Sequence, residues 1–129
     1  MSAERLPTPT ESVEQQRLFQ WAAVMSGRYP ELDPDGHLFF HIPNEGKRTK
    51  ANGARLKAEG MRRGTPDVCL AVPRGGCHGL YIELKRIRGG RLEKDQAAAL
   101  DALRAQGYAV AVCRGWEAAA RVIEEYLAL

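Results

Sequence analysis

The stretch GTPDVCLAVPRGGCHGLYIELK, residues 64–85, contains two strand-like segments, 67–72 and 80–85, separated by a glycine-rich turn. Two such segments around a short turn predict a β-hairpin. Side chains alternate between the faces of a strand, so the apolar and the charged residues of 80–85 separate. One face carries Leu80, Ile82 and Leu84, and the other carries Tyr81, Glu83 and Lys85. Charge near a core needs a partner or a purpose, so the hairpin holds a candidate site.

The rest of the chain predicts elements that cover this hairpin. A helix is expected from Pro9 to about Ser26, with Thr8 as its N-cap and Glu11 as the capping-box partner. Periodicity then predicts a strand at 37–42, a helix at 49–59, a helix at 92–106, a strand at 108–113 and a helix at 116–127. This order predicts an α/β fold in which helices flank a mixed sheet of about four strands. Residues 8–129 are expected to form one domain, after a disordered N-terminus at 1–7.

Composition places the chain among soluble globular proteins. Its 129 residues are 44% hydrophobic, which is enough for one core, and no apolar run approaches the roughly 20 residues of a membrane helix. The N-terminus lacks the apolar region of a secretory signal, so we expect a cytoplasmic protein. The odd count of three cysteines does not predict a disulfide framework, and in a strand His37 and His41 would lie too far apart to favour zinc.

Positive charge is concentrated in two places. Residues 47–63 hold seven basic side chains against one acid, Glu59, and residues 85–94 hold a second cluster. Such asymmetry fits a polyanion bound on one face, but it also fits a solvated basic helix and loop. Charge alone leaves both interpretations open.

Two polar residues interrupt apolar helix faces. Glu14 lies in line with Leu18 and Trp21 on the first predicted helix, and Gln96 lies within the apolar stripe of the helix at 92–106. Each could reach solvent from the edge of its stripe. Alternatively, both helices pack on a sheet whose charged face holds a site.

The second interpretation brings Glu14 toward Asp67, Glu83 and Lys85. Neighbouring carboxylates repel and raise each other's pKa, and a divalent cation removes that cost. Oxygen ligands with open positions suit Mg²⁺ or Mn²⁺ rather than zinc, and such ions support phosphodiester hydrolysis. An ordinary Glu–Lys pair on a strand surface is the alternative.

These residues resemble the PD-(D/E)XK nuclease superfamily, and more narrowly a stand-alone VRR-NUC domain. The matching stretches are HIPNEGKR (41–48), GMRRGTPDVCL (60–70), LYIELKRIRGGRLEKDQ (80–96) and GYAVAVCRGWEAA (107–119). The resemblance implies a restriction-endonuclease-like core.

The resemblance also implies roles for individual residues. Asp67 and Glu83 correspond to the metal-binding acids, with the backbone carbonyl of Leu84 completing the coordination and Glu14 contributing through water. Lys85 corresponds to the catalytic lysine, and Gln96 to a glutamine of the site. We expect DNA to be contacted by Asn44, Lys47, Arg48, Lys50, Arg55, Lys57, Arg62, Arg63, Arg86, Arg88 and Arg91.

The expected function is a Mg²⁺- or Mn²⁺-dependent endodeoxyribonuclease without a small-molecule cofactor. The small members that the chain resembles imply a homodimeric resolvase of four-way (Holliday) junctions, often phage-encoded and acting in a bacterial host cell. Three alternatives stay open: a nuclease of flaps, single strands or RNA; a non-catalytic nucleic-acid-binding module; and a structural protein with a surface ion pair.

Overall fold

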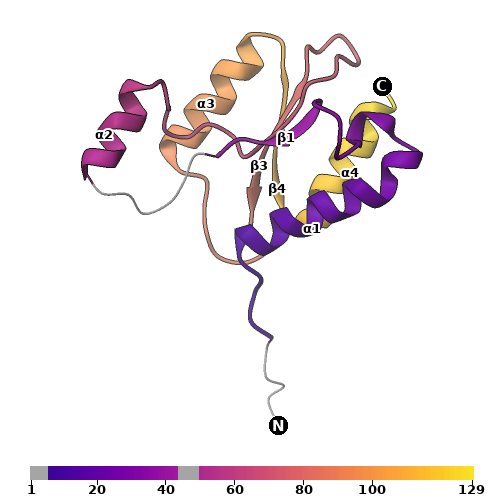
Figure 1. Ribbon diagram of the computed structural model, residues 1–129, viewed down its shortest axis with the longest axis horizontal. Helices are drawn as coiled ribbons and strands as arrows, with labels where there is room; N and C mark the ends of the chain where they lie inside the picture. The colour runs from indigo at the N-terminus through magenta and orange to yellow at the C-terminus, as the bar shows by residue number, and fades with distance from the viewer. Residues whose placement is uncertain (1–5, 44–49) are drawn as a thin grey trace.

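The computed structural model describes residues 6–43 and 50–129, and within them one mixed four-stranded sheet is flanked by helices (Figure 1). This confirms the predicted α/β fold. The strands are β1 Phe39–His41, β2 Val68–Leu70, β3 Leu80–Lys85 and β4 Ala109–Arg114. The α-helices are α1 Glu11–Val24, α2 Lys50–Ala58, α3 Lys94–Ala105 and α4 Trp116–Leu127, and two 3₁₀ turns, η1 Met25–Gly27 and η2 Pro30–Leu32, follow α1. Among these described residues, no helix has the length and apolar character needed to cross a membrane.

The strands lie in the order β1-β2-β3-β4. Strand β2 is antiparallel to both β1 and β3, which confirms the predicted hairpin of β2 and β3, whereas β3 and β4 are parallel. A parallel pair needs a crossover connection, and α3 supplies it. Val68 pairs with Ile82. Asp67, the residue before β2, therefore stands opposite Glu83.

The two faces of the sheet differ as the alternation in β3 predicts. Leu80, Ile82 and Leu84 belong to the apolar core, together with Leu18 of α1 and Ile123 of α4. The opposite face of β3 meets α3, because the Lys85 ammonium donates to the Gln96 side chain of that helix. The charged face is covered as well as the apolar one, and this buries both Glu83 and Lys85.

The start of the first helix corrects one prediction. The N-cap is Thr10 rather than Thr8, and α1 begins at Glu11. Thr10 has an extended backbone, and its hydroxyl accepts a hydrogen bond from the Val13 amide at 3.2 Å. Pro9 therefore precedes the helix, because the cap that satisfies a first-turn amide lies after it.

The start of α3 corrects another prediction. Glu93 is its N-cap and forms a reciprocal capping box with Gln96, whose Oε1 accepts from the Glu93 amide at 2.9 Å. Leu92 therefore lies outside the helix, 37% exposed, rather than in its apolar stripe. Strands β1 and β2 are also shorter than the predicted 37–42 and 67–72.

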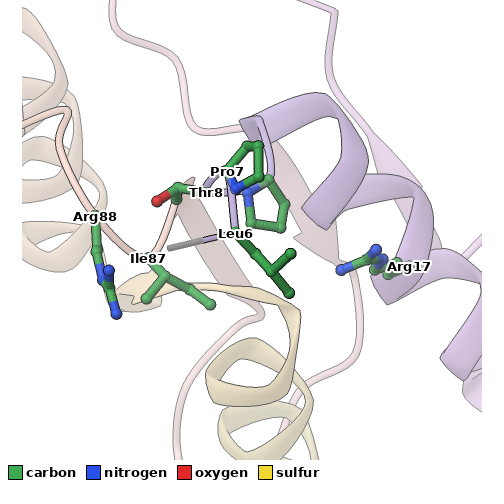
Figure 2. Close-up of a pocket in the computed structure, with 7 residues that line it drawn as sticks. Leu6, Pro7, Thr8, Arg17, Ile87 and Arg88 are labelled. Carbon is green, nitrogen blue, oxygen red and sulfur yellow. The ribbon is translucent and has the colours of Figure 1, made fainter. Parts of the chain in front are cut away.

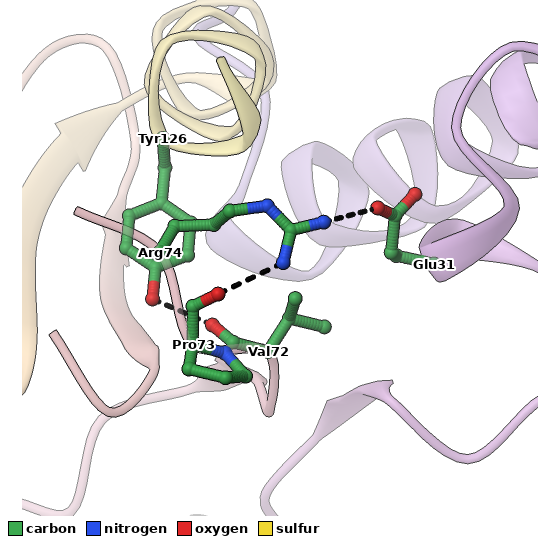
Figure 3. Close-up of polar contacts among 5 residues, drawn as sticks. All are labelled: Glu31, Val72, Pro73, Arg74 and Tyr126. Carbon is green, nitrogen blue, oxygen red and sulfur yellow. Dashed lines mark hydrogen bonds and ion pairs between the residues drawn. The ribbon is translucent and has the colours of Figure 1, made fainter. Parts of the chain in front are cut away.

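Two side chains tie the turn between β2 and β3 to the rest of the molecule (Figure 3). The buried Tyr126 hydroxyl donates to the Val72 carbonyl at 2.6 Å. The Arg74 guanidinium donates to Glu31 at 2.6 Å and to the Pro73 carbonyl at 2.8 Å. Helix α4 and turn η2 thus hold the turn of the hairpin that carries the candidate site.

At the other end of the hairpin, Gly64 packs directly against α3. Its φ of +83° is a left-handed conformation, and a Cβ added there would lie 2.3 Å from the Asp95 carbonyl oxygen. Only glycine fits both constraints. The contact brings the segment before Asp67 against the helix that carries Gln96.

We predict that Gly64→Ala destabilises the fold by about 2–4 kcal/mol, because it adds backbone strain and a clash with fixed backbone. Urea unfolding monitored by circular dichroism measures this loss. Gly53→Ala is the matched control, since a Cβ at that helical position meets no atom within 4 Å. Equal stability of the two variants would contradict the prediction.

Candidate active site

Asp67 lies at the open end of the hairpin, and hydrogen bonds to its side chain and its backbone hold it there. Its Oδ2 accepts a hydrogen bond from the Leu84 amide at 2.8 Å. Its carbonyl oxygen accepts from the Ile42 amide at 2.7 Å and from His41 Nδ1 at 2.8 Å. The half-buried carboxylate is thereby fixed opposite Glu83, on the edge of β3 that faces β2.

Glu83 is 2% exposed and lies against this carboxylate. Burial, a hydrogen bond with the Asp67 side chain and the negative charges of Asp67 and Glu11 raise the pKa of Glu83 from 4.5 to about 9, against the lowering effect of the Lys85 ammonium. Without a cation, the Asp67–Glu83 pair therefore holds a proton at neutral pH. A divalent cation would offset the same repulsion, so the oxygen donors present fit a hard metal ion.

Lys85 is buried on the same face of β3 and is oriented by α3. Its Nζ donates to Gln96 Oε1 at 2.8 Å, and the same oxygen accepts from the Glu93 amide. The inward position of Gln96 is thus explained by a polar contact with Lys85 and with the helix start. The structure brings together Asp67, Glu83, Lys85 and Gln96, as the sequence predicts.

Glu14 has a different set of contacts. It is 1% exposed, and its Oε1 accepts from the amide of Trp116, the first residue of α4, at 3.1 Å. Its Oε2 has no hydrogen-bond partner among the described residues. Within 6–43 and 50–129, no three side chains of histidine, cysteine, aspartate or glutamate gather into a metal site. The structure therefore brings two carboxylates together, with Glu14 bound to the start of α4.

Sequence reasoning missed the role of Glu11. This acid of α1, rather than Glu14, is the one whose charge raises the pKa of Glu83. The sequence signal for a role of Glu11 in the site was its position three residues before Glu14, since residues three apart are neighbours on a helix surface. The mistaken cap at Thr8 concealed it by giving Glu11 a capping role.

The predicted DNA-binding residues that the structure describes lie on two exposed segments. Helix α2 carries Lys50, Arg55 and Lys57, has no buried residue and projects from the sheet beyond α3 (Figure 1). Arg62 and Arg63 follow it, and Arg63 pairs with Asp95 at 3.4 Å. Exposed positions between β3 and α3 hold Arg86, Arg88 and Arg91. Asn44, Lys47 and Arg48 lie outside the described residues.

Comparison with known proteins connects this geometry to one family. The family model of the VRR-NUC domain matches residues 10–117. A solved structure described as a "VRR_NUC domain protein" superimposes with a TM-score of 0.77 at 24% sequence identity, over 96% of this chain and 93% of that chain. At this identity the superposition shows a shared fold. No protein of curated function matches the chain.

The raised pKa of Glu83 predicts how stability depends on pH. In metal-free protein the folded state keeps a proton on Glu83 that the unfolded chain releases above pH 4.5, so stability is lost as the pH rises from 4.5 through about 9. We predict that Glu83→Gln removes this loss. Urea unfolding in EDTA across this pH range measures it.

The control for this measurement is Glu117→Gln, which changes an exposed acid of α4 and keeps the wild-type dependence on pH. The same dependence in Glu83→Gln and in the wild type would show that Glu83 does not hold the proton.

Proposed function

The chain belongs to the VRR-NUC family, whose domain is of the nuclease type, and we propose that it is a Mg²⁺- or Mn²⁺-dependent endonuclease of branched DNA. In its most specific form the proposal is a homodimeric resolvase that cuts four-way junctions. The observation that carries the nuclease assignment is the arrangement of the half-buried Asp67 with the buried Glu83 and Lys85 at one end of the hairpin, with Gln96 bound to the lysine.

The cation would be held by oxygen atoms at the edge of β3 next to Asp67. The carboxylates of Asp67 and Glu83 are the first candidates. The Leu84 amide donates to Asp67 Oδ2, and the amide and carbonyl of one strand residue face the same neighbouring strand. The Leu84 carbonyl therefore faces the same edge. Glu14, whose Oε2 lacks a protein partner among the described residues, is proposed to act through water. A bound cation would neutralise charge on the scissile phosphate and polarise it.

Lys85 supplies a positive charge from a buried position on β3. Because Gln96 fixes its ammonium at 2.8 Å, the group is oriented before substrate arrives. We propose that it orients the attacking water or stabilises charge on the phosphate in the transition state. Gln96 positions Lys85, and the capping box with Glu93 positions Gln96.

The two basic segments support binding of the DNA backbone. Exposed arginine and lysine side chains bind phosphates without reading sequence. The basic residues of α2 precede the hairpin and those of 86–91 follow it, and we propose that both groups contact a substrate whose scissile phosphate lies at the acids. Asn44, Lys47 and Arg48 stay predictions of the sequence.

The preference for a four-way junction is argued from symmetry. Such a junction has nearly two-fold symmetry, and a two-fold dimer can present one site to each of two strands. The proposal of a homodimer rests on this argument. A nuclease of flaps, single strands or RNA, and a binding module without cleavage, are the other outcomes of the experiment below.

We predict that the protein nicks a labelled four-way junction in Mg²⁺ or Mn²⁺ but not in EDTA. It should leave a linear duplex of the same sequence uncut. Asp67→Ala and Glu83→Ala should each lower the rate by at least about a hundredfold while DNA binding survives, because each removes a proposed ligand of the cation. Glu117→Ala, at an exposed position of α4, is the control.

Paired nicks on the junction alone would support the dimeric resolvase. Equal cutting of both DNAs would contradict junction selectivity and favour flaps, single strands or RNA as substrates. Binding without cleavage in either metal would contradict the nuclease proposal.

A second prediction separates Lys85 from the acids. Lys85→Ala should lower the cleavage rate by about a hundredfold or more, as expected for a group that acts in the transition state, and keep most of the Mn²⁺ affinity. Calorimetric titration with Mn²⁺ measures that affinity. Gln106→Ala, at the far end of α3, is the control. Loss of Mn²⁺ binding in Lys85→Ala would assign Lys85 a structural role instead.

A further inference from the structure

We infer that Arg114, the last residue of β4, is a positioning residue that holds the β3–α3 loop in the shape in which it meets DNA. This loop consists of residues 86–93, between Lys85 and α3. The inference rests on the proposed DNA substrate. It concerns a residue outside the acid, lysine and glutamine set.

The Arg114 guanidinium binds three backbone carbonyls of this loop. Its Nη1 donates to the Arg86 carbonyl at 3.1 Å and to the Gly89 carbonyl at 2.9 Å. Its Nη2 donates to the Gly90 carbonyl at 3.0 Å. Hydrogen bonds from a charged donor are stronger than neutral ones, and the planar fork of arginine matches several acceptors at once. One side chain therefore fixes both ends of a five-residue turn.

The loop sequence is adapted to this contact. Gly89 and Gly90 have φ values of +71° and +61°, a left-handed conformation that glycine adopts without strain. A Cβ at Gly89 would lie 2.5 Å from Nη2 of Arg86, so the Arg86 side chain folds over this turn. The consecutive glycines permit the tight turn whose carbonyls Arg114 binds.

A second contact anchors the loop to the same strand end. A Cβ at Gly115 would lie 3.0 Å from Cγ1 of Ile87, so the Ile87 side chain packs against the backbone that follows Arg114. The Gly115 amide also donates to the Lys85 carbonyl at 2.8 Å. In the parallel pairing of β3 with β4, Arg114 lies opposite Lys85. The end of β4 thus sets the direction in which the chain leaves the proposed catalytic lysine.

The loop held in this way carries positive charge and directly follows Lys85 of the proposed site. Arg86, Arg88 and Arg91 are exposed on it. Ile87 and Arg88 form one wall of a surface cavity of about 510 Å³ (Figure 2). The opposite side of the cavity is formed by residues 6–9 and Arg17.

An ordered loop binds phosphates more tightly than a mobile one, because less conformational entropy is lost on binding. The Arg114 guanidinium itself is directed at loop carbonyls. Its contribution to DNA binding is therefore the order of the loop, and the loop arginines make the contacts.

The experiment compares Arg114→Lys and Arg114→Gln with Arg121→Gln, which removes the same charge from an exposed position of α4. The first readout is the rate at which trypsin cuts after the loop arginines in metal-free protein without DNA. Neither lysine nor glutamine can donate to all three carbonyls as the guanidinium does. We therefore expect trypsin cleavage to be about tenfold faster in both Arg114 variants and unchanged in Arg121→Gln. This readout does not depend on nuclease activity.

The second readout is the cleavage of a four-way junction. We expect KM to rise about tenfold in both Arg114 variants while kcat changes by less than about threefold, because binding is affected and the transition-state groups are intact. Arg114→Lys keeps the charge, so a defect shared with Arg114→Gln assigns the effect to hydrogen-bond geometry. If Arg114→Gln does not fold, Arg114→Lys alone decides.

An unchanged trypsin rate would overturn the inference. A faster trypsin rate with unchanged KM would also overturn it, since Arg114 would then brace the fold without serving DNA binding. If the wild-type protein cuts no DNA, the proposed function fails, and the dissociation constant for the same junction replaces KM in judging Arg114.

Discussion

Two acids, Asp67 and Glu83, stand opposite each other across β2 and β3, and much of the fold serves to keep them there. Register puts them together, and burial holds a proton between them at neutral pH. Such a pair is unfavourable in a metal-free fold, so the surrounding structure must prevent it from separating. Three contacts hold the pair together. They are the hydrogen bond from the Leu84 amide to Asp67, the hydrogen bond from the Tyr126 hydroxyl to the hairpin turn, and the close packing of Gly64 against α3.

Gln96 joins the proposed chemistry to the folding of α3. Its Oε1 accepts from the Glu93 amide and from the Lys85 ammonium, so one atom both caps the helix and orients the lysine. The helix cannot start elsewhere without releasing Lys85, and Lys85 cannot move without losing its hydrogen bond to Gln96. A buried ammonium without partners is costly, so the site and the helix start stabilise each other.

Periodic patterns of apolar residues in the sequence predicted which face of a strand is buried and where one regular helix begins and ends. The alternation in 80–85 separated Glu83 and Lys85 from the apolar face, and α4 has the predicted ends because its apolar residues repeat clearly. Contacts between distant residues left no such signal. The carboxylate of Glu14 binds an amide 102 positions away, and Arg114 binds carbonyls across 24 or more positions. The effect of Glu11 on Glu83 depends on where α1 begins, and the mistaken cap at Thr8 concealed it.

The two basic segments differ in how they are held, and this difference bears on selectivity. Helix α2 buries no residue, so its lysines and arginines can follow a DNA backbone of almost any shape and contribute salt-dependent, unselective affinity. The β3–α3 loop is fixed to the end of β4 by three hydrogen bonds from one guanidinium. A loop fixed in this way would admit only a DNA backbone of matching shape. On the proposed function, discrimination between branched and linear DNA therefore arises at the loop rather than at α2, because only a rigid surface can reject a substrate.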